Sequence, residues 1–296
     1  MRVLVAADAM AGVGPRDASD IIGAAFAEAG AQVAVVPLVD GGPWFPDAVA
    51  AFDATGVVEQ PATMAEALDA LASPASTATR LYLDLTGLAR HTWAELVAVG
   101  PQRLDALRDA LAGRELMGVV RSGQQGAALT GLTGVVAERG RTEGADLGDT
   151  LNNDSIVSAW LEQVGVDGAT PGAGAADGLG AVVVALGGRV SSGIEVCVAG
   201  FDVAATMAQA DLTVTGASVL DFHAVGGDVV KEVARLSTDA LRPVIAIVGR
   251  NFVSSRELRL AGIESAHPIL EGAGADEPIP AQVGDVAARV ARSWIW

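Results

Sequence analysis

The sequence predicts an α/β protein with a doubly wound, mostly parallel, Rossmann-like sheet. Short and nearly continuous apolar runs, at residues 2–7 and 31–38, are typical of parallel strands that are buried on both faces. Amphipathic helical segments alternate with these runs; the first starts at Pro15 and stops at Gly30. The connections between them are short, and this β-α-β order indicates a doubly wound sheet.

Composition limits the class of protein. The chain has 296 residues, 51% of them hydrophobic and only 4% aromatic, which is enough for an aliphatic core in one large or two modest domains. The net charge of −17 argues against nucleic acid and anionic membranes as partners. No apolar run reaches the roughly 18–20 residues of a membrane span, and no signal peptide is apparent, so we expect a cytoplasmic protein. The single cysteine, Cys197, excludes an internal disulfide and is expected to be a small buried residue.

The remaining elements follow in order along the chain. A helix at residues 92–111 is expected to break at Gly100-Pro101, and a helix at 149–164 has Leu151, Ile156, Trp160 and Leu161 on its apolar face. Further strands are predicted near 57–58, 81–85, 115–120, 243–249 and 263–270. Further helices are predicted at 46–52, within 60–78, and at 228–236, 254–260 and 281–292.

A glycine-rich stretch, residues 171–227, organises the chain. It opens with four glycines between residues 172 and 180, followed by an Ala/Val run. Small residues let backbone N–H groups approach a ligand, and a helix after them directs its positive end at an anion, although close Gly/Ala packing explains the pattern equally well. Residues 211–216 are expected to form a strand that ends in a glycine turn, which is how open α/β sheets place a site.

Several motifs resemble one known family. PGAGAADGLGAVVVALGG, SSGIEV and DLTVTG, in this order and spacing, resemble the C-terminal motifs of bacterial two-domain glycerate kinases, and MRVLVAAD and VPLVDGG resemble the family's N-terminal motifs. The resemblance covers about residues 1–50 and 118–270. It implies a Rossmann-like domain made of residues 1–60 and 171–296, with a reduced inserted α/β domain at residues 61–170.

The resemblance also implies site residues. Asp8 and Asp40 follow predicted parallel strands and are expected to face one crevice, although strand-end carboxylates also bind loop amides. Asp221 is either a vestigial catalytic position or a turn cap. The implied nucleotide-binding residues are Gly172, Gly174, Gly178, Thr215 and Gly216, and the implied substrate residues are Gly41, Gly42 and Ser218.

The departures from the family pattern bear on activity. After the opening Asp the family has a lysine and serines, whereas this chain has Ala9-Met10-Ala11-Gly12, and a later Gly-Lys is Gly227-Asp228. Losing one preorganised positive group costs ~10²–10³ in rate. We therefore expect a pseudoenzyme, with lost or very weak ATP-dependent phosphorylation of glycerate, retained as a binding or assembly scaffold without a cofactor.

Two alternatives stay open. One is an active kinase for glycerate or another small hydroxy acid, using ATP and Mg²⁺, with Arg121, Arg139 or Arg141 in place of the missing lysines. The other is a structural subunit of a heteromeric complex.

Some side chains outside these motifs also carry expectations. No Cys/His cluster has metal-ligand spacing, so no metal site is expected. His223 is expected to be an exposed loop residue or a replacement acid/base. Trp44, or the chain end with Trp294 and Trp296, could contact a partner protein or a second copy of the chain; the terminal tryptophans could equally dock on the protein's own core.

Overall fold

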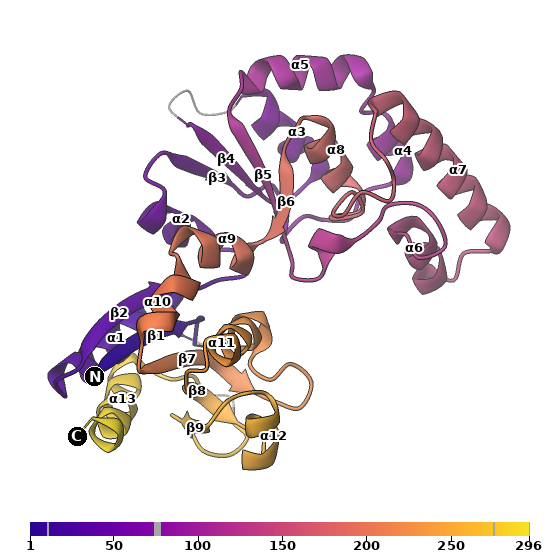
Figure 1. Cartoon of the computed structure of the whole chain (residues 1–296). Coiled ribbons are helices and arrows are strands. Elements are labelled where there is room, and N and C mark those ends of the chain that lie inside the picture. The colour runs from indigo at the N-terminus through magenta and orange to yellow at the C-terminus, as the bar shows by residue number, and fades with distance from the viewer. Residues whose placement is uncertain (11, 74–77, 275, 296) are drawn as a thin grey trace. The chain divides into compact units, whose positions relative to one another are not determined.

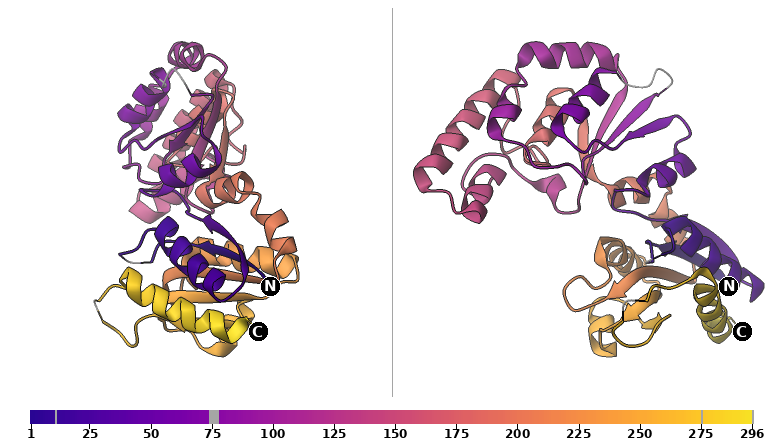
Figure 2. Two further views of the ribbon diagram at one scale, coloured as in Figure 1. Left: turned by 90° about the vertical axis from the view of Figure 1, so that its left-hand side faces the viewer. Right: turned by 180° about the vertical axis from the view of Figure 1, so that it is seen from behind.

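The computed structural model describes residues 1–10, 12–73, 78–274 and 276–295 and divides into two compact units. The first unit is Met1–Val39 with Cys197–Trp296, and the second is Asp40–Val196. Each unit has its own parallel sheet flanked by helices (Figures 1 and 2), as the sequence predicts for the α/β class. The second unit takes in residues 40–60 and 171–196, which the resemblance assigned to the Rossmann-like domain.

The first unit is built on a five-stranded parallel sheet in the order β2-β1-β7-β8-β9. Its strands are β1 (Arg2–Ala7), β2 (Gln32–Pro37), β7 (Leu212–Leu220), β8 (Val244–Asn251) and β9 (Ser265–Pro268). The chain moves outward from β1 to β2 and then returns to the other side of β1 with β7. This reversal is a topological switch point, and open α/β sheets bind ligands at the carboxyl ends of the strands beside such a point.

Helices cover both faces of this sheet. On one face α1 (Pro15–Glu28) and α13 (Pro280–Trp294) pack together over alternate strand residues, with Ile22 and Phe26 in the shared core. α1 starts at a proline, whose fixed φ suits the first helical turn. The same strands contact α11 (Gly227–Asp239), which packs with α10 (Val203–Gln209), while the short α12 (Ser255–Leu260) lies against β9.

The second unit contains a four-stranded parallel sheet in the order β3-β4-β5-β6. Its strands are β3 (Gly56–Glu59), β4 (Arg80–Asp84), β5 (Glu115–Val120) and β6 (Arg189–Ser192). Its helices are α2 (Phe45–Phe52), α3 (Met64–Ala72), α4 (Trp93–Val97), α5 (Pro101–Leu111), α6 (Val135–Glu143), α7 (Leu147–Val164) and α8 (Leu179–Ala185), with the 3-10 turn η1 (Gln124–Gly126) and with α9 (Gly193–Gly200), which carries the boundary between the units. Leu, Val and Ala side chains from α3, α5, α7 and α8 form one core with β4 and β5.

Most predicted elements are confirmed, including the helix break at Gly100-Pro101, where α5 begins at the proline. Others are missed or wrong. The helices α6, α9 and α10 and the strand β6 were not predicted. In α7, Trp160 and Leu161 are buried as expected, but Leu151 and Ile156 are 55% and 43% exposed, because only the last part of this helix packs on the core. Within the described ranges, no helix is long and apolar enough to cross a membrane.

Candidate functional site

The predicted site residues divide between the two units. Those of the first unit are Asp8, Thr215, Gly216, Ser218 and Asp221. Those of the second unit are Asp40, Gly41, Gly42, Gly172, Gly174 and Gly178.

At the switch point of the first unit, the chain leaves β1 through Asp8. The Asp8 N–H donates to the Gly216 carbonyl (3.0 Å), and its carboxylate accepts the Ala9 N–H (2.7 Å). Two residues later, Met10 forms a β-bridge with Val13 and is only 1% exposed. Its terminal methyl lies on Gly216, where an added Cβ would come within 2.5 Å of it. An apolar side chain therefore covers the end of β1 and the middle of β7.

Gly216 does not form the predicted turn, because β7 continues through it to Leu220. The residue pairs with Ala7 on one side and Ile247 on the other, and an added Cβ would also lie 2.7 Å from the Ile247 carbonyl oxygen. Close packing inside the sheet thus explains this glycine. The neighbouring Thr215 hydroxyl is buried without a hydrogen-bond partner in the described part of the chain, and the Ser218 hydroxyl donates to the Ala9 carbonyl (3.2 Å).

Asp221 caps the turn that leads into α11. Its carboxylate accepts the N–H groups of Ala224 (2.7 Å) and His223 (3.0 Å), and these bonds, with the Ala224 bond first, lower the pKa of the carboxyl group. His223 itself is exposed, as one of its two interpretations expected. The geometry accounts for Asp221 as a turn cap, and its vestigial catalytic role stays a prediction.

Arg250 is a buried cation that the sequence analysis did not single out. It lies near the end of β8, is 8% exposed, and donates to the carbonyls of Glu271 and Gly272 (3.0 and 2.6 Å) and of Asp276 (3.1 Å). These bonds occupy the guanidinium with backbone oxygens. An arginine inside an otherwise apolar strand was the signal in the sequence.

In the second unit, a buried carboxylate lies at the end of β4. Asp84 is 2% exposed and accepts four hydrogen bonds. One oxygen takes the Gly42 N–H and the Gln60 side-chain amide (2.8 Å each), and the other takes the Thr86 N–H (3.0 Å) and hydroxyl (2.6 Å). Asp84 is absent from the predicted site, although an acidic residue at the end of an apolar strand is a visible signal.

The predicted substrate glycines pack around Asp84. Gly41 and Gly42 have φ of +96° and +80°, which disfavours any residue with a Cβ. A Cβ at Gly41 would lie 2.5 Å from the Thr86 methyl group. The double glycine therefore lets a tight turn present its N–H to a buried carboxylate.

Asp40, just before these glycines, ties the loop to two strand ends. Its carboxylate accepts the Ser122 N–H (3.0 Å) and hydroxyl (2.9 Å) after β5, and the Ile194 N–H (3.1 Å) in the first turn of α9. The Asp40 carboxylate thus accepts hydrogen bonds from groups of the protein. This agrees with the alternative that strand-end carboxylates bind loop amides.

The glycine-rich loop (residues 172–178) uses its N–H groups within the protein. Gly174 donates to the Ala127 carbonyl (2.9 Å), and Gly178 donates to the carbonyls of Gly174 and Ala175 (3.2 Å each). A Cβ at Gly172 would meet Val190 at 2.8 Å, and one at Gly178 would meet Leu96 at 2.6 Å. Close packing accounts for these glycines, and nucleotide binding by the loop stays a prediction.

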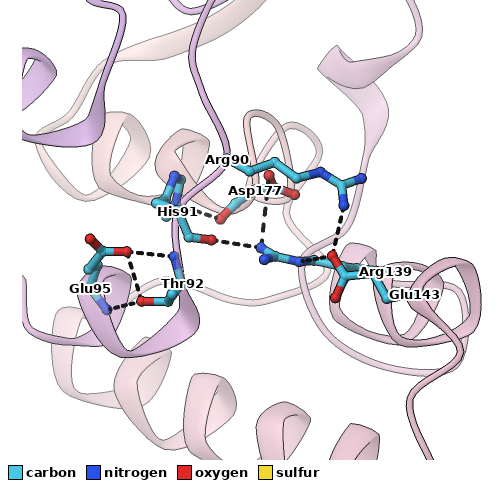
Figure 3. Close-up of polar contacts among 7 residues, drawn as sticks. All are labelled: Arg90, His91, Thr92, Glu95, Arg139, Glu143 and Asp177. Atoms are coloured by element: carbon cyan, nitrogen blue, oxygen red, sulfur yellow. Dashed lines mark hydrogen bonds and ion pairs between the residues drawn. The ribbon is translucent and has the colours of Figure 1, made fainter.

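The three arginines of the active-kinase alternative differ in their surroundings. The Arg139 guanidinium lies 3.9 Å from the Asp177 carboxylate of the loop and donates to Glu143 (3.0 Å) and to the His91 carbonyl (2.8 Å) (Figure 3). It also stacks over the Trp93 ring. Arg141 donates to the Leu132 carbonyl. Arg121 follows β5, donates its Nε–H to the Thr86 carbonyl (3.0 Å), and is exposed. Arg139 is thus held by protein groups, whereas Arg121 has a solvent-facing guanidinium at the carboxyl edge of the sheet.

The aromatic residues of the predicted partner surface are only partly accessible. Trp44 is 48% exposed, while Phe45 beside it is buried and packs edge-on against Tyr82, with ring centroids 6.1 Å apart. Trp294 packs against the core of the first unit, and Trp296 lies outside the described residues. Among the residues with described positions, no group of three or more His, Cys, Asp or Glu is placed to hold a metal ion.

Comparison with known proteins identifies the family. Both units are α/β units with a parallel sheet, so the chain is a two-unit α/β protein. The family model for the glycerate kinase family matches residues 125–294, more than half of the chain. The chain belongs to the glycerate kinase family.

Individual relatives support this at lower coverage. Uncharacterized proteins of Mycobacterium bovis and Mycobacterium tuberculosis are 34% identical over 177 residues, and glycerate 2-kinase of Escherichia coli K12 is 31% identical over 105 residues, or 35% of this chain and 28% of that protein. The mycobacterial alignments cover 58% of this chain and 45% of those proteins, so they span about half of the relatives' length. A crystal structure from Salmonella typhimurium LT2, assigned as a glycerate kinase 2, has the same fold, with a TM-score of 0.66 over 99% of this chain and 96% of that one at 20% identity.

Proposed function

We propose that this member of the glycerate kinase family has lost efficient phosphotransfer to glycerate and is retained as a binding or assembly scaffold. Phosphotransfer needs cations and metal-binding carboxylates around the transferred group, because catalysis consists mainly of positioning and charge stabilisation.

The main support for the proposal is the burial of Met10 against Gly216. At the switch point of the first unit, where the family pattern leads us to expect lysine and serine side chains after Asp8, a buried methionine packs its methyl group on Gly216. A methyl group gives no stabilisation to a developing oxyanion, and a site that lacks a preorganised cation loses ~10²–10³ in rate.

The two carboxylates of the second unit support the proposal. Asp84 accepts four protein hydrogen bonds, and three are found for Asp40. To coordinate Mg²⁺ or to remove a proton, either group would have to give up charge-assisted bonds to backbone N–H groups. We infer that both carboxylates stabilise the fold.

A coupled assay for ADP release, with ATP, Mg²⁺ and glycerate, tests the proposal. Kinases turn over at about 1–100 s⁻¹, and we expect a rate at least 10²-fold below that range. The matched variant is Asp40→Asn, which identifies any residual rate that belongs to this protein. Turnover of about 1 s⁻¹ or more that disappears in Asp40→Asn would refute the loss of activity.

One observation favours the active-kinase alternative. Arg121 places an exposed guanidinium beside Thr86 at the carboxyl edge of the second sheet, and Arg121→Gln with Arg103→Gln as a surface control tests its role. If Arg121 clamps phosphate, its substitution lowers kcat/KM by ~10²-fold or more, while the control has no effect.

Two experiments test the assembly role. Light scattering of the purified chain measures its oligomeric state, and a pull-down from cell extract followed by light scattering detects a complex with another protein.

A further inference from the structure

His91 lies at the meeting point of three segments of the second unit (Figure 3). It directly precedes the N-cap of α4, its carbonyl accepts a hydrogen bond from Arg139 of α6, and its ring reaches the glycine-rich loop. The residue is 6% exposed, and its Nε2 atom is 3.1 Å from the Asp177 carbonyl oxygen.

These contacts define the tautomer. A carbonyl oxygen only accepts hydrogen bonds, so the Nε2 atom carries the proton and donates it to Asp177. The Nδ1 atom is then an unprotonated nitrogen, and it is buried without a partner among the described residues. A second proton would sit on Nδ1 as a buried N–H group with no acceptor, which is a costly arrangement.

Two non-glycine residues of the loop have left-handed backbone. Ala176 and Asp177 have φ of +48° and +51°, a left-handed conformation that is unfavourable for a residue with a Cβ. Such backbone persists only where its surroundings hold it. The described side-chain contacts to Asp177 are the His91 ring at its carbonyl and Arg139 at its carboxylate.

The charges around His91 come from each segment packed on it. Arg139 and Glu143 lie on α6, Asp177 on the loop, Glu95 on α4, and Arg90 is the neighbour in sequence. Burial is the main cause that lowers the pKa of His91, and Arg139 lowers it further, while Asp177 and Glu95 oppose the shift. His91 is therefore neutral at pH 7.

We propose that the protonation state of His91 controls the conformation of the glycine-rich loop. The neutral ring keeps residues 172–178 in the closed conformation, and protonation in mild acid lets the loop open. This change in loop order does not require phosphotransfer. It gives the protein a conformational response to pH in a loop that the family pattern associates with nucleotide.

The size of the response follows from proton linkage. If the open loop exposes His91 with its ordinary pKa of 6.5 and the closed loop excludes the proton, the open fraction rises about tenfold between pH 7.5 and pH 5.5. Hydrogen–deuterium exchange of peptides that cover residues 171–181, corrected for the intrinsic pH dependence of exchange, measures this fraction directly.

The key variant is His91→Gln, whose amide can donate to the Asp177 carbonyl but does not titrate. We expect its loop protection to be independent of pH, while the exposed control His223→Gln keeps the tenfold loss of the wild type. Equal pH dependence in His91→Gln and the wild type would overturn the proposal.

A second variant keeps the test decisive if His91→Gln does not fold. Asp177→Asn preserves a residue that tolerates left-handed backbone and removes the carboxylate that favours protonation. The open loop sets the pKa that governs this response, so we expect the variant to keep the roughly tenfold rise in the open fraction between pH 7.5 and pH 5.5, with the His91 ring, followed by ¹³C detection, taking up its proton as the loop opens. If the His91 ring titrates with a pKa near 6.5 while the protection of the loop does not change, the proposed control of the loop by His91 is wrong.

Discussion

Asp84→Ala tests most directly whether the carboxylates at the sheet edge stabilise the fold. The substitution removes the acceptor of four hydrogen bonds at a site that is 2% exposed. The side-chain donors of Gln60 and Thr86 can turn toward other acceptors, but the N–H groups of Gly42 and Thr86 are fixed by the backbone. At about 1–3 kcal/mol for each unsatisfied N–H group, the expected loss is about 4 kcal/mol.

The assay is thermal unfolding followed by tryptophan fluorescence and calorimetry. For a unit of 150–250 residues, about 4 kcal/mol corresponds to a fall in Tm of about 8–16 °C. Trp93 and Trp160 report on the second unit, which matters because the two units need not unfold together. Asp69→Ala, on the exposed surface of α3, is the control and should shift Tm by no more than about 2 °C.

A different result would show that Asp84 binds a ligand. If Asp84→Ala unfolds within about 2 °C of the wild type and loses binding of glycerate or Mg·ATP, the carboxylate serves a ligand. The structural interpretation of Asp84, and with it a main support of the pseudoenzyme proposal, would then be wrong.

Three further predictions concern packing and charge. Gly180→Ala places a Cβ against the Gly172 carbonyl oxygen and should destabilise the second unit by about 2–3 kcal/mol in urea unfolding, whereas Gly87→Ala, in open space with ordinary φ, should cost less than about 0.5 kcal/mol. Trp160→Phe removes a buried 2.8 Å hydrogen bond to a backbone carbonyl, and we expect a loss of about 1–2 kcal/mol by the same measurement. Burial lowers the pKa of His267 from 6.5, so the unfolded chain binds the proton more readily and stability falls as the pH drops below about 6.5; His267→Gln should flatten the urea midpoint between pH 7.5 and 5.5, and an unchanged slope would contradict this.

The fold was largely predictable because its signals are local. Apolar runs such as the one in β5 mark buried strands, and Gly100-Pro101 ends one helix and starts the next. The strand β6 escaped prediction because its sequence, RVSS, is short and polar, and it joins the sheet only through pairing with β5. The turn predicted at Gly216 was wrong because glycine also serves close packing inside a strand.

The candidate site was less predictable, since its properties depend on partners that are distant in sequence. The sequence places Asp40 at a strand end, but only the structure shows that Ser122 and Ile194 supply its donors. Asp84 has the same position at the end of β4 and was missed, because nothing local in the sequence shows that Gly42 donates to it.

The acidic double-glycine turn shows that a family motif can serve the fold by itself. Gly41 and Gly42 adopt positive φ, and the turn they form brings one N–H to a buried carboxylate on the neighbouring strand. Selection for stability alone would retain such a turn, because replacing either glycine strains the backbone and disturbs the bond to Asp84. The motif is therefore evidence of ancestry and of fold, while evidence of catalysis has to come from groups that serve no structural purpose. Of the three arginines that could replace the missing lysines, Arg121 comes nearest to that description, because it is exposed and follows β5 at the carboxyl edge of the second sheet. Arg121→Gln is therefore the most informative single test for residual phosphotransfer.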